Sequence, residues 1–404
     1  MTERRTATVV GGGLAGLAAA TALGAAGWQV LVLERAADFS EVGAGLAITR
    51  NGMAALDGLG VGGRTRSVAY ETFAAGTRDE NGRWLLQLPV DAGGPAVLNR
   101  AWGVHRQRLH AVLLAAAADC DLVTGARVVQ VDVGDPGGAP ASVTWHDGAR
   151  ERTVASDLVV AADGVRSTTR SASSAGRGPG LRYSGFTCWR AVVDDDDCAS
   201  GSGFAAYWGP STEFGAVRIS DDQVYWYGYF RHPAGQPFAD ELDAAIARFA
   251  DWAPEVRAMV ASTTPARLLR HDVHHLSGDL RTHVLGRVVL IGDAAHAMLP
   301  TMGQGANTAL EDGLCVGRLI GEPVVGGMPL RDALAAYDRA RRPRCRRIAH
   351  RSAQTARFGA HVPGGLRQVL RNAAIRSVPA GPAVAAGTAL LRWEAPPQGR
   401  AGAH

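Results

Sequence analysis

The sequence contains no lysine, so all 42 of its basic residues are arginines. This absence excludes chemistry that needs a lysine amine, such as Schiff bases, Walker A phosphate loops and lysine general bases. The net charge of +4 and the pI near 9 would permit binding to nucleic acid. The arginines are scattered among acids, however, so we expect no nucleic-acid partner. Their one dense run, residues 339–347 with six arginines, is predicted to face solvent on a helix.

Cysteine is also scarce, and the five cysteines form no CxxC pair and no zinc-ligand spacing. We therefore expect no disulfide framework, no metal and a reducing, cytoplasmic location. The run His271-Asp272-Val273-His274-His275 carries potential metal ligands but fits a strand better. No membrane span is predicted, because the apolar stretch at residues 7–27 contains a glycine fingerprint and continues into a strand that ends in an acid.

The N-terminal segment has the pattern of a dinucleotide-binding unit. A predicted strand, Thr6–Val10, leads into Gly11-Gly12-Gly13-Leu14-Ala15-Gly16, a GxGxxG sequence at the start of an alanine-rich helix expected to reach Ala26. A second strand is predicted at Gln29–Leu33, and Glu34 follows it. The glycines allow a tight turn and close approach of a pyrophosphate, and Glu34 would accept hydrogen bonds from the ribose hydroxyls. An acid here disfavours a 2′-phosphate, so the dinucleotide is FAD or NAD.

A second glycine-rich stretch lies in residues 287–313. Val288–Ile291 is a predicted buried strand that Gly292-Asp293 ends, and a Pro and Gly loop then leads to a helix. Asn307 is expected to cap this helix, which would run to Leu319. The loop amides and the helix N-terminus favour an anion or a ring that becomes anionic, such as reduced flavin.

Residues 292–312, with GD, P and GQGxN in that order, resemble the second FAD-binding motif of the class A flavoprotein monooxygenases, the FAD-dependent aromatic hydroxylases of the p-hydroxybenzoate hydroxylase type. Asp157–Ser167 resembles the DG motif of that family, and residues 105–110 match its Arg-x-x-Leu pattern. Residues 41–48 resemble the segment that passes the dimethylbenzene side of the flavin, after which Asn51 is expected to cap a short helix ending near Gly60.

The resemblance implies FAD as the resident cofactor and NADPH or NADH as a transient reductant. In the family, the residue matching Asp293 hydrogen-bonds the ribityl chain, the DG aspartate serves the pyrophosphate, and the GQGxN loop follows the pyrimidine edge. The implied cofactor contacts are Gly11, Gly13, Ala15, Gly16, Glu34, Arg35, Gly45, Arg106 (with Arg108 as the alternative), Asp163, Asp293, Pro300, Gly303, Gly305, Ala306 and Asn307.

Most of the aromatic residues lie between Tyr183 and Leu285, on runs that alternate as strands do. In residues 224–230 three tyrosines share one face, while Trp226 and Phe230 share the other. We expect a sheet with one face in a core and the other forming a pocket wall for a planar ligand. The candidates for orienting a phenolic or acidic substrate are Arg190 and Tyr227. For His296, structural hydrogen bonding is favoured over a role as a base.

Taken together, these patterns predict an α/β protein in which a Rossmann-like FAD-binding domain is interleaved with a mainly antiparallel β-sheet substrate domain and followed by C-terminal helices. The expected FAD-binding domain comprises residues 1–70, 100–180 and 286–345, the substrate domain 71–99 and 181–285, and the C-terminal helices and tail 346–404.

The predicted activity is NAD(P)H-consuming hydroxylation of an aromatic or polycyclic small molecule by O2, through a flavin C4a-hydroperoxide, in a monomer or homodimer. Epoxidation and Baeyer–Villiger oxidation on the same fold stay open. A binding module with the FAD fold and no catalysis is the alternative from another class.

Overall fold

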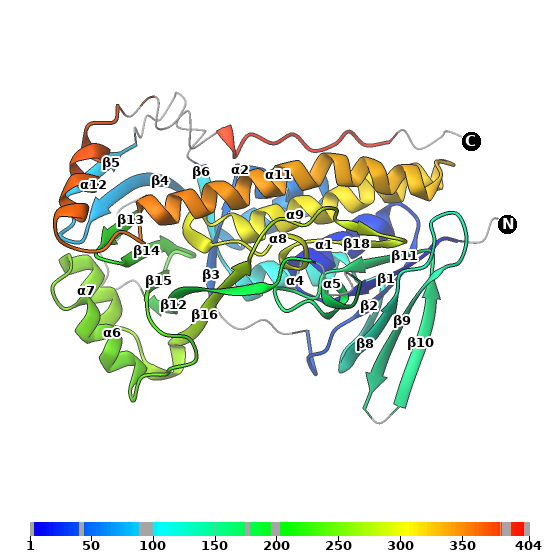
Figure 1. The fold of residues 1–404 in the computed structure, drawn as a ribbon, viewed down its shortest axis with the longest axis horizontal. Helices are drawn as coiled ribbons and strands as arrows, with labels where there is room; N and C mark the ends of the chain where they lie inside the picture. The colour runs from blue at the N-terminus through cyan, green and yellow to red at the C-terminus, as the bar shows by residue number, and fades with distance from the viewer. Residues whose placement is uncertain are drawn as a thin grey trace.

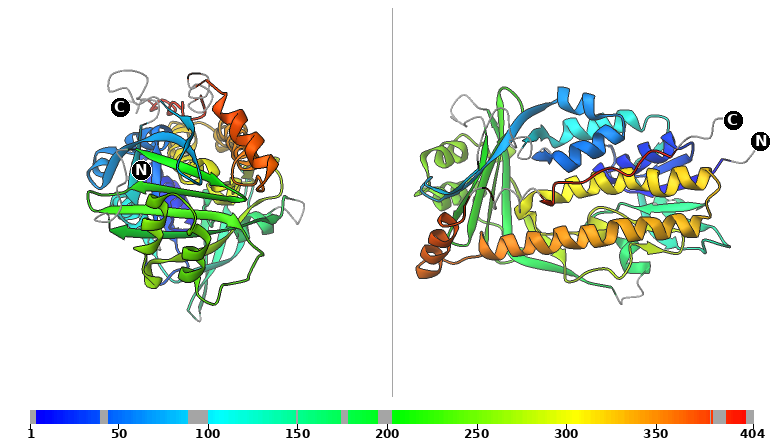
Figure 2. Two further views of the ribbon diagram at one scale, coloured as in Figure 1. Left: turned by 90° about the vertical axis from the view of Figure 1, so that its left-hand side faces the viewer. Right: turned by 90° about the horizontal axis from the view of Figure 1, so that it is seen from above.

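The computed structural model describes residues 4–39, 44–88, 100–148, 150–173, 178–194, 203–379, 381 and 389–399, and the statements of structure below concern these residues. The molecule is elongated (Figure 1), with a parallel sheet and its helices at one end and a large, mainly antiparallel sheet at the other. Two helices run along its length, α9 (Gln304–Val316) and the 29-residue α11 (Leu330–Phe358), and they lie side by side (Figure 2).

The first sheet has six strands in the order β17-β18-β11-β1-β2-β7, all parallel except β17. Its strands are apolar on both faces because each face is covered. Helices α1, α4 and α9 pack on one face, and the antiparallel sheet β8–β10 packs on the other. The bounds are β1 Thr6–Val10, α1 Leu14–Ala25, β2 Gln29–Leu33, α4 Arg106–Ala116, β7 Asp121–Val123, β8 Ala126–Asp132, β9 Ala141–Asp147, β10 Arg150–Ser156, β11 Leu158–Ala161, β17 Val284–Leu285 and β18 Val288–Leu290.

The second sheet has the order β16-β12-β15-β14-β13-β4-β6-β3, with β5 paired to β4. Its pairs are antiparallel except β13 with β4, which confirms the predicted sheet type. Strands β3 and β6 hydrogen-bond into this sheet, although the expected division puts their residues in the FAD-binding domain. The bounds are β3 Gly45–Thr49, β4 Ala69–Asp79, β5 Trp84–Gln87, β6 Arg100–His105, β12 Leu181–Asp194, β13 Phe204–Gly209, β14 Thr212–Arg218, β15 Gln223–Arg231 and β16 Leu269–Leu276.

The two faces of β15 differ as predicted. Trp226 and Phe230 are fully buried in a cluster with helices α6 (Glu241–Phe249) and α7 (Pro254–Ala261). Tyr225, Tyr227 and Tyr229 belong to separate clusters on the opposite face. The histidine-rich run at 271–275 lies within strand β16, also as predicted.

Two predicted helix caps are wrong. Helix α2 (Arg50–Gly58) begins before Asn51, and α9 begins at Gln304, three residues before Asn307. Both asparagines are fully buried and bond to other elements instead of capping their own helices. Asn307 accepts from Thr49 N at 2.9 Å and donates to Ala47 O at 3.1 Å. Asn51 donates to the side chains of Gln304 at 3.0 Å and Glu311 at 2.6 Å.

The end of α9 also differs from the prediction. The α-helix stops at Val316, and a π-helical turn, Gly317–Gly321, leads into α10 (Glu322–Val325). The remaining helices are short: α3 Gly62–Ser67, α5 Thr168–Ser173, α8 Asp293–His296 and α12 Leu366–Arg376. In the described part of the chain, no helix combines the length and the apolar character that crossing a bilayer requires.

The prediction that the arginine run 339–347 faces solvent is wrong for two of its members. The run lies on α11, where Arg341 is only 1% exposed. Its guanidinium donates to Asp312 Oδ1 at 2.7 Å and to Glu311 Oε2 at 2.6 Å, and Arg344 donates to both oxygens of Glu311 at 2.6 Å. Because α9 presents two buried carboxylates to α11, the arginines that face it are drawn inward and paired.

Candidate active site

The glycine fingerprint forms a tight loop between β1 and α1. Gly11 has φ +105°, and a Cβ there would lie 2.5 Å from Ala162 O. A Cβ on Gly16 would collide with the carbonyl oxygen of Gly11. Helix α1 can therefore approach the turn this closely only if position 16 is glycine. No side chain caps α1 at Gly13. His110, which sequence reasoning missed, bonds Gly12 O through Nε2 at 2.8 Å and fixes the loop.

Glu34 lies at the end of β2 and faces this loop. Its Oε2 accepts from Gly12 N at 2.7 Å and its Oε1 accepts from Ala36 N at 2.9 Å. Each carboxylate oxygen keeps a further lone pair for a hydroxyl donor such as a ribose. Arg35, the next predicted contact, is exposed.

The DG aspartate has two different oxygens. Asp163 Oδ2 accepts from Thr169 N at 3.0 Å and Thr169 Oγ1 at 2.9 Å, whereas the buried Oδ1 has no partner in the described part of the chain. Arg170, which the sequence did not single out, donates to Val165 O at 2.8 Å and Ala294 O at 3.0 Å. This arginine therefore ties the DG turn to the GD turn that follows β18.

The GD turn and the start of α9 complete the rim. Asp293 is exposed, and among the described residues its carboxylate has no hydrogen-bond partner. Pro300 opens a 3-10 turn that ends at Gly303, whose φ of +62° is left-handed. The N-cap residue of α9 is Gly303, which has no side chain to accept a hydrogen bond. The backbone N–H groups around Gly305 and Ala306 therefore receive no side-chain cap. Ala15, in the first turn of α1, lies against Gly292, so the first and last motifs adjoin.

Opposite this rim, the tyrosine face of β15 meets Arg190 on β12. Arg190 pairs with Tyr227 in the strand register, and its buried Nε has no partner among the described residues. The charges of Tyr225, Cys188 and Asp293 raise the pKa of Arg190, although burial of the guanidinium lowers it. The structure thus brings the predicted pair Arg190 and Tyr227 together, on a face whose tyrosines pack with Leu299 beside the predicted contact Pro300.

Two more predicted contacts adjoin Tyr225. Burial raises the pKa of Tyr225 to about 12, against the opposing charges of Arg190 and Arg106. A Cβ on Gly45 would collide with the Tyr225 ring, so the glycine lets β3 lie against it. Arg108, the alternative to Arg106, instead points to an exposed contact with Gln223 at 3.5 Å.

A buried carboxyl on the same face of the sheet as the tyrosines was missed by the sequence analysis. Glu213 on β14 is 2% exposed, and it accepts from Tyr227 Oη at 2.7 Å and Trp208 Nε1 at 3.0 Å. Burial raises the pKa of Glu213 to about 7 despite these donors. Burial, together with Glu213, raises the pKa of Tyr227 well above its usual value. One sequence signal could have indicated this carboxyl: an acid among apolar residues on a predicted strand, next to a predicted strand that carries tyrosines.

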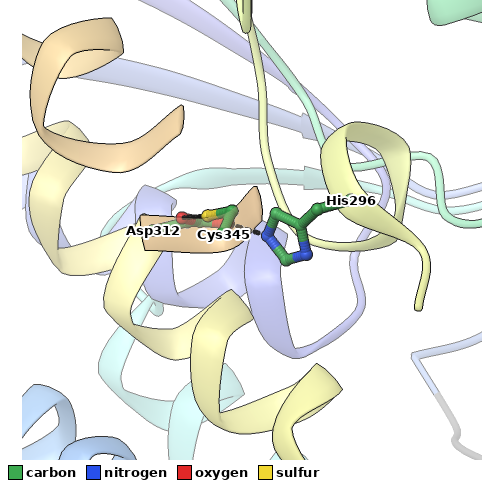
Figure 3. Close-up of side chains that lie close together, drawn as sticks. All are labelled: His296, Asp312 and Cys345. Atoms are coloured by element: carbon green, nitrogen blue, oxygen red, sulfur yellow. Dashed lines mark hydrogen bonds and ion pairs between the residues drawn. The ribbon is translucent and has the colours of Figure 1, made fainter. Parts of the chain in front are cut away.

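Behind the GD turn, His296 takes the structural role that was favoured for it. Its Nε2 bonds Asp312 Oδ2 at 2.6 Å, and Gly292 N donates to the same oxygen at 2.9 Å. Figure 3 shows His296, Asp312 and Cys345 together, with their ligand atoms within 4.8 Å of one another. Arg341 contacts both Asp312 and Cys345, so a fixed cation already occupies this cluster and repels a metal ion. Burial opposes ionisation of Asp312, but Arg341 and His296 hold its pKa below its usual range.

These residues fit an FAD molecule on four observations. The Gly11 turn is too close-packed for a side chain, Glu34 keeps lone pairs at the loop, Asp293 offers an unpaired carboxylate, and α9 presents uncapped amides. Both side-chain N–H groups of Asn307 are already taken, by Ala47 O and Gly303 O, so this side chain has no N–H left to donate to FAD.

Comparisons with known proteins agree with this geometry. A family model described as FAD binding domain matches residues 4–352. Aurachin C monooxygenase/isomerase of Stigmatella aurantiaca is 34% identical over 78% of this chain and 80% of that protein. The 2-heptyl-3-hydroxy-4(1H)-quinolone synthase of Pseudomonas aeruginosa is 32% identical, again over 78% and 80%. The structure of Klebsiella pneumoniae HpxO complexed with FAD and uric acid has the same fold, with a TM-score of 0.82, 24% identity and 96% coverage of both chains.

Proposed function

The chain belongs to the FAD binding domain family and is an FAD-dependent monooxygenase, and from this premise we propose that it hydroxylates a fused-ring aromatic small molecule with O2, consuming NADH or NADPH. Bound FAD would be held by the fingerprint loop, Glu34, the DG and GD turns and the start of α9. It would take a hydride from the nicotinamide and supply the transferred oxygen atom after reaction with O2, by the route that the family resemblance implies.

The observation that carries the proposal is the placement of Arg190. A partly buried guanidinium, with one N–H that has no partner in the described part of the chain, lies beside Tyr227 in the strand register. A buried cation of this kind is costly unless an oxygen of a ligand or cofactor pairs with it. The planar fork of arginine suits a ring carbonyl, an enolate or a phenolate.

Tyr227 supplies the complementary function. Its hydroxyl hydrogen is committed to Glu213, so its oxygen lone pairs are left to accept from a ligand. A substrate that carries a ring oxygen beside an N–H or O–H group would satisfy Arg190 and Tyr227 together. Because the pKa of Tyr227 is raised, we assign the residue to binding and orientation and not to proton abstraction.

The names of the relatives support the same substrate class. Urate and a 4(1H)-quinolone are both fused two-ring nitrogen heterocycles with ring carbonyls. They appear in the names of two relatives that are 29% and 32% identical to this chain. We therefore propose a bicyclic nitrogen heteroaromatic as the substrate, with simple phenols as poorer ligands.

The test is rapid-mixing reduction of the purified yellow holoenzyme by NADH and NADPH, with and without quinolones, urate and phenols, followed by mixing with labelled O2. We expect faster nicotinamide oxidation with the right heteroaromatic and one labelled oxygen atom in the product. The structure of the product separates hydroxylation from epoxidation and Baeyer–Villiger insertion. If the reduced enzyme returns only hydrogen peroxide with every compound, or if neither nicotinamide reduces it, the proposal fails.

Arg190→Lys tests the orienting role, with Arg182→Lys as the control because Arg182 is an exposed arginine on the same strand. Lysine keeps the charge but loses the fork, so we expect kcat/KM to fall about tenfold or more while FAD content is unchanged. An Arg190→Lys enzyme with the kcat/KM of the control would remove Arg190 from the substrate site.

A further inference from the structure

Helix α12 (Leu366–Arg376) buries polar side chains and exposes apolar ones, the reverse of an ordinary surface helix. Its polar residues Gln368 and Arg371 are buried, whereas Leu366, Val369 and Leu370 are 73%, 63% and 60% exposed. With 3.6 residues per turn, the spacing i, i+3, i+4 puts these three side chains on one stripe. Surface helices of globular proteins bury such a stripe, so an exposed one indicates a surface that contacts something else.

The inward orientation of α12 is fixed by specific contacts. Gln368 Nε2 donates to Glu80 Oε1 at 2.6 Å, and Arg371 donates to Gly359 O at 2.9 Å and Trp208 O at 3.2 Å. The Arg371 guanidinium also lies over the Trp208 ring, 5.8 Å from its centroid. Rotating the apolar stripe inward would break all of these contacts, so the exposure of the stripe is built into the fold.

The exposed apolar side chains are concentrated here. Of the ten large hydrophobic residues that are exposed in the described part of the chain, five lie between residues 358 and 378, and they include Phe358 at 71% and Val378 at 44%. Figures 1 and 2 show α12 at one end of the molecule, beyond the end of α11 and beside β5. The end of the long axis is therefore an apolar tip.

The charged residues of this segment have one sign. Residues 357–378 contain four arginines and no aspartate or glutamate. Arg367 and Arg376 lie on the two flanks of the stripe by helical geometry, and Arg357 precedes Phe358. The two acids that hydrogen-bond to α12, Asp79 and Glu80, accept from Arg376 and Gln368. An apolar stripe rimmed by exposed arginines complements a surface that is apolar beneath an anionic layer.

We propose that α12 and Phe358 seat this protein on the surface of an anionic phospholipid membrane, with the apolar stripe at the level of the headgroups and the arginines on the phosphates. This contact lies in the plane of the interface and requires no membrane-spanning helix. Because Arg371 packs on Trp208, whose indole N–H donates to Glu213, the helix is anchored to strands β13 and β14 of the large sheet.

The experiment is flotation of the full-length holoenzyme with vesicles of phosphatidylcholine alone and of phosphatidylcholine with phosphatidylglycerol in equal amounts, at low and high salt. We expect binding to the phosphatidylglycerol vesicles that weakens as salt rises. Val369→Ser with Leu370→Ser should weaken it about tenfold or more. Arg367→Glu should weaken it at least about fivefold.

Two control variants keep the test specific. Ile246→Ser removes an apolar side chain that is 43% exposed on α6, and Arg257→Glu reverses an exposed charge on α7. Both should float like the wild type. Absence of wild-type binding to phosphatidylglycerol vesicles overturns the proposal. So does stripe-dependent dimerisation in the ultracentrifuge without flotation, or equal loss of binding in the control variants. Flotation does not depend on turnover, so its outcome is separable from that of the proposed function.

Discussion

Replacing Glu213 by glutamine gives a quantitative test of the buried carboxyl that accepts from Tyr227 and Trp208. Burial raises the pKa of this carboxyl from its usual 4.5 to about 7. Between these pH values the folded protein holds a proton that the unfolded chain has released, so its stability falls as pH rises. At about 1.4 kcal/mol per pH unit, the loss is about 2 to 3 kcal/mol between about pH 5 and pH 8. Glu213→Gln has no such titration.

The substitution also has a cost that does not depend on pH. The glutamine oxygen can still accept from Tyr227, but its NH2 group cannot accept from Trp208, which loses a buried hydrogen bond worth about 1 to 3 kcal/mol. We therefore expect Glu213→Gln to be the less stable protein at about pH 5 and to approach or pass the wild type at about pH 8.

Urea denaturation of both holoenzymes across this pH range measures the difference, with Glu394→Gln as an exposed control that should follow the wild type. Infrared difference spectra should show a carboxylic acid band that disappears near pH 7 in the wild type and is absent from Glu213→Gln. Parallel stability curves, to within about 0.5 kcal/mol, would refute the reasoning, because a carboxyl that ionises alike in both states contributes no slope.

Three further predictions concern the cofactor site and the fold. Asp293→Ala should weaken FAD binding about tenfold or more, measured by dilution of the holoenzyme, whereas Asp251→Ala should not; equal retention would contradict the GD assignment. Arg341→Met leaves two buried carboxylates short of a partner and should cost about 3 to 5 kcal/mol in urea melts, against little change for the exposed Arg339→Met. Gly16→Ala should abolish FAD binding, since its Cβ meets the Gly11 carbonyl; a yellow, stable variant would disprove that.

Features that depend on local pattern could be predicted from the sequence alone. A buried apolar run, a glycine turn, a small-residue helix and an acid are contiguous in residues 6–34, so strand, turn and helix could be placed to within a residue. The period of two on β15 likewise predicted which aromatic side chains share a face, because alternation is a property of any strand.

What the tertiary structure decided is which side chain meets which across long sequence separations. Asn307 is a residue type that often caps helices. Its side chain instead hydrogen-bonds the backbone of β3, some 260 residues away in sequence. Arg341 lies in a run of like charges that favours solvent, yet two acids on α9 draw it inward. Nothing local in either segment encodes these partners.

The same reason explains the site residues that were missed. Arg170 matters because its helix faces the GD turn, and Glu213 matters because β14 pairs with the strand that carries Tyr227. The inverted helix α12 is a further case: its sequence shows an apolar stripe, but only the packing of Arg371 on Trp208 decides that the stripe faces outward. Local pattern thus predicted the strands and glycine turns, whereas the Arg190–Tyr227–Glu213 cluster and the apolar tip depend on contacts that exist only once the sheets and helices have packed.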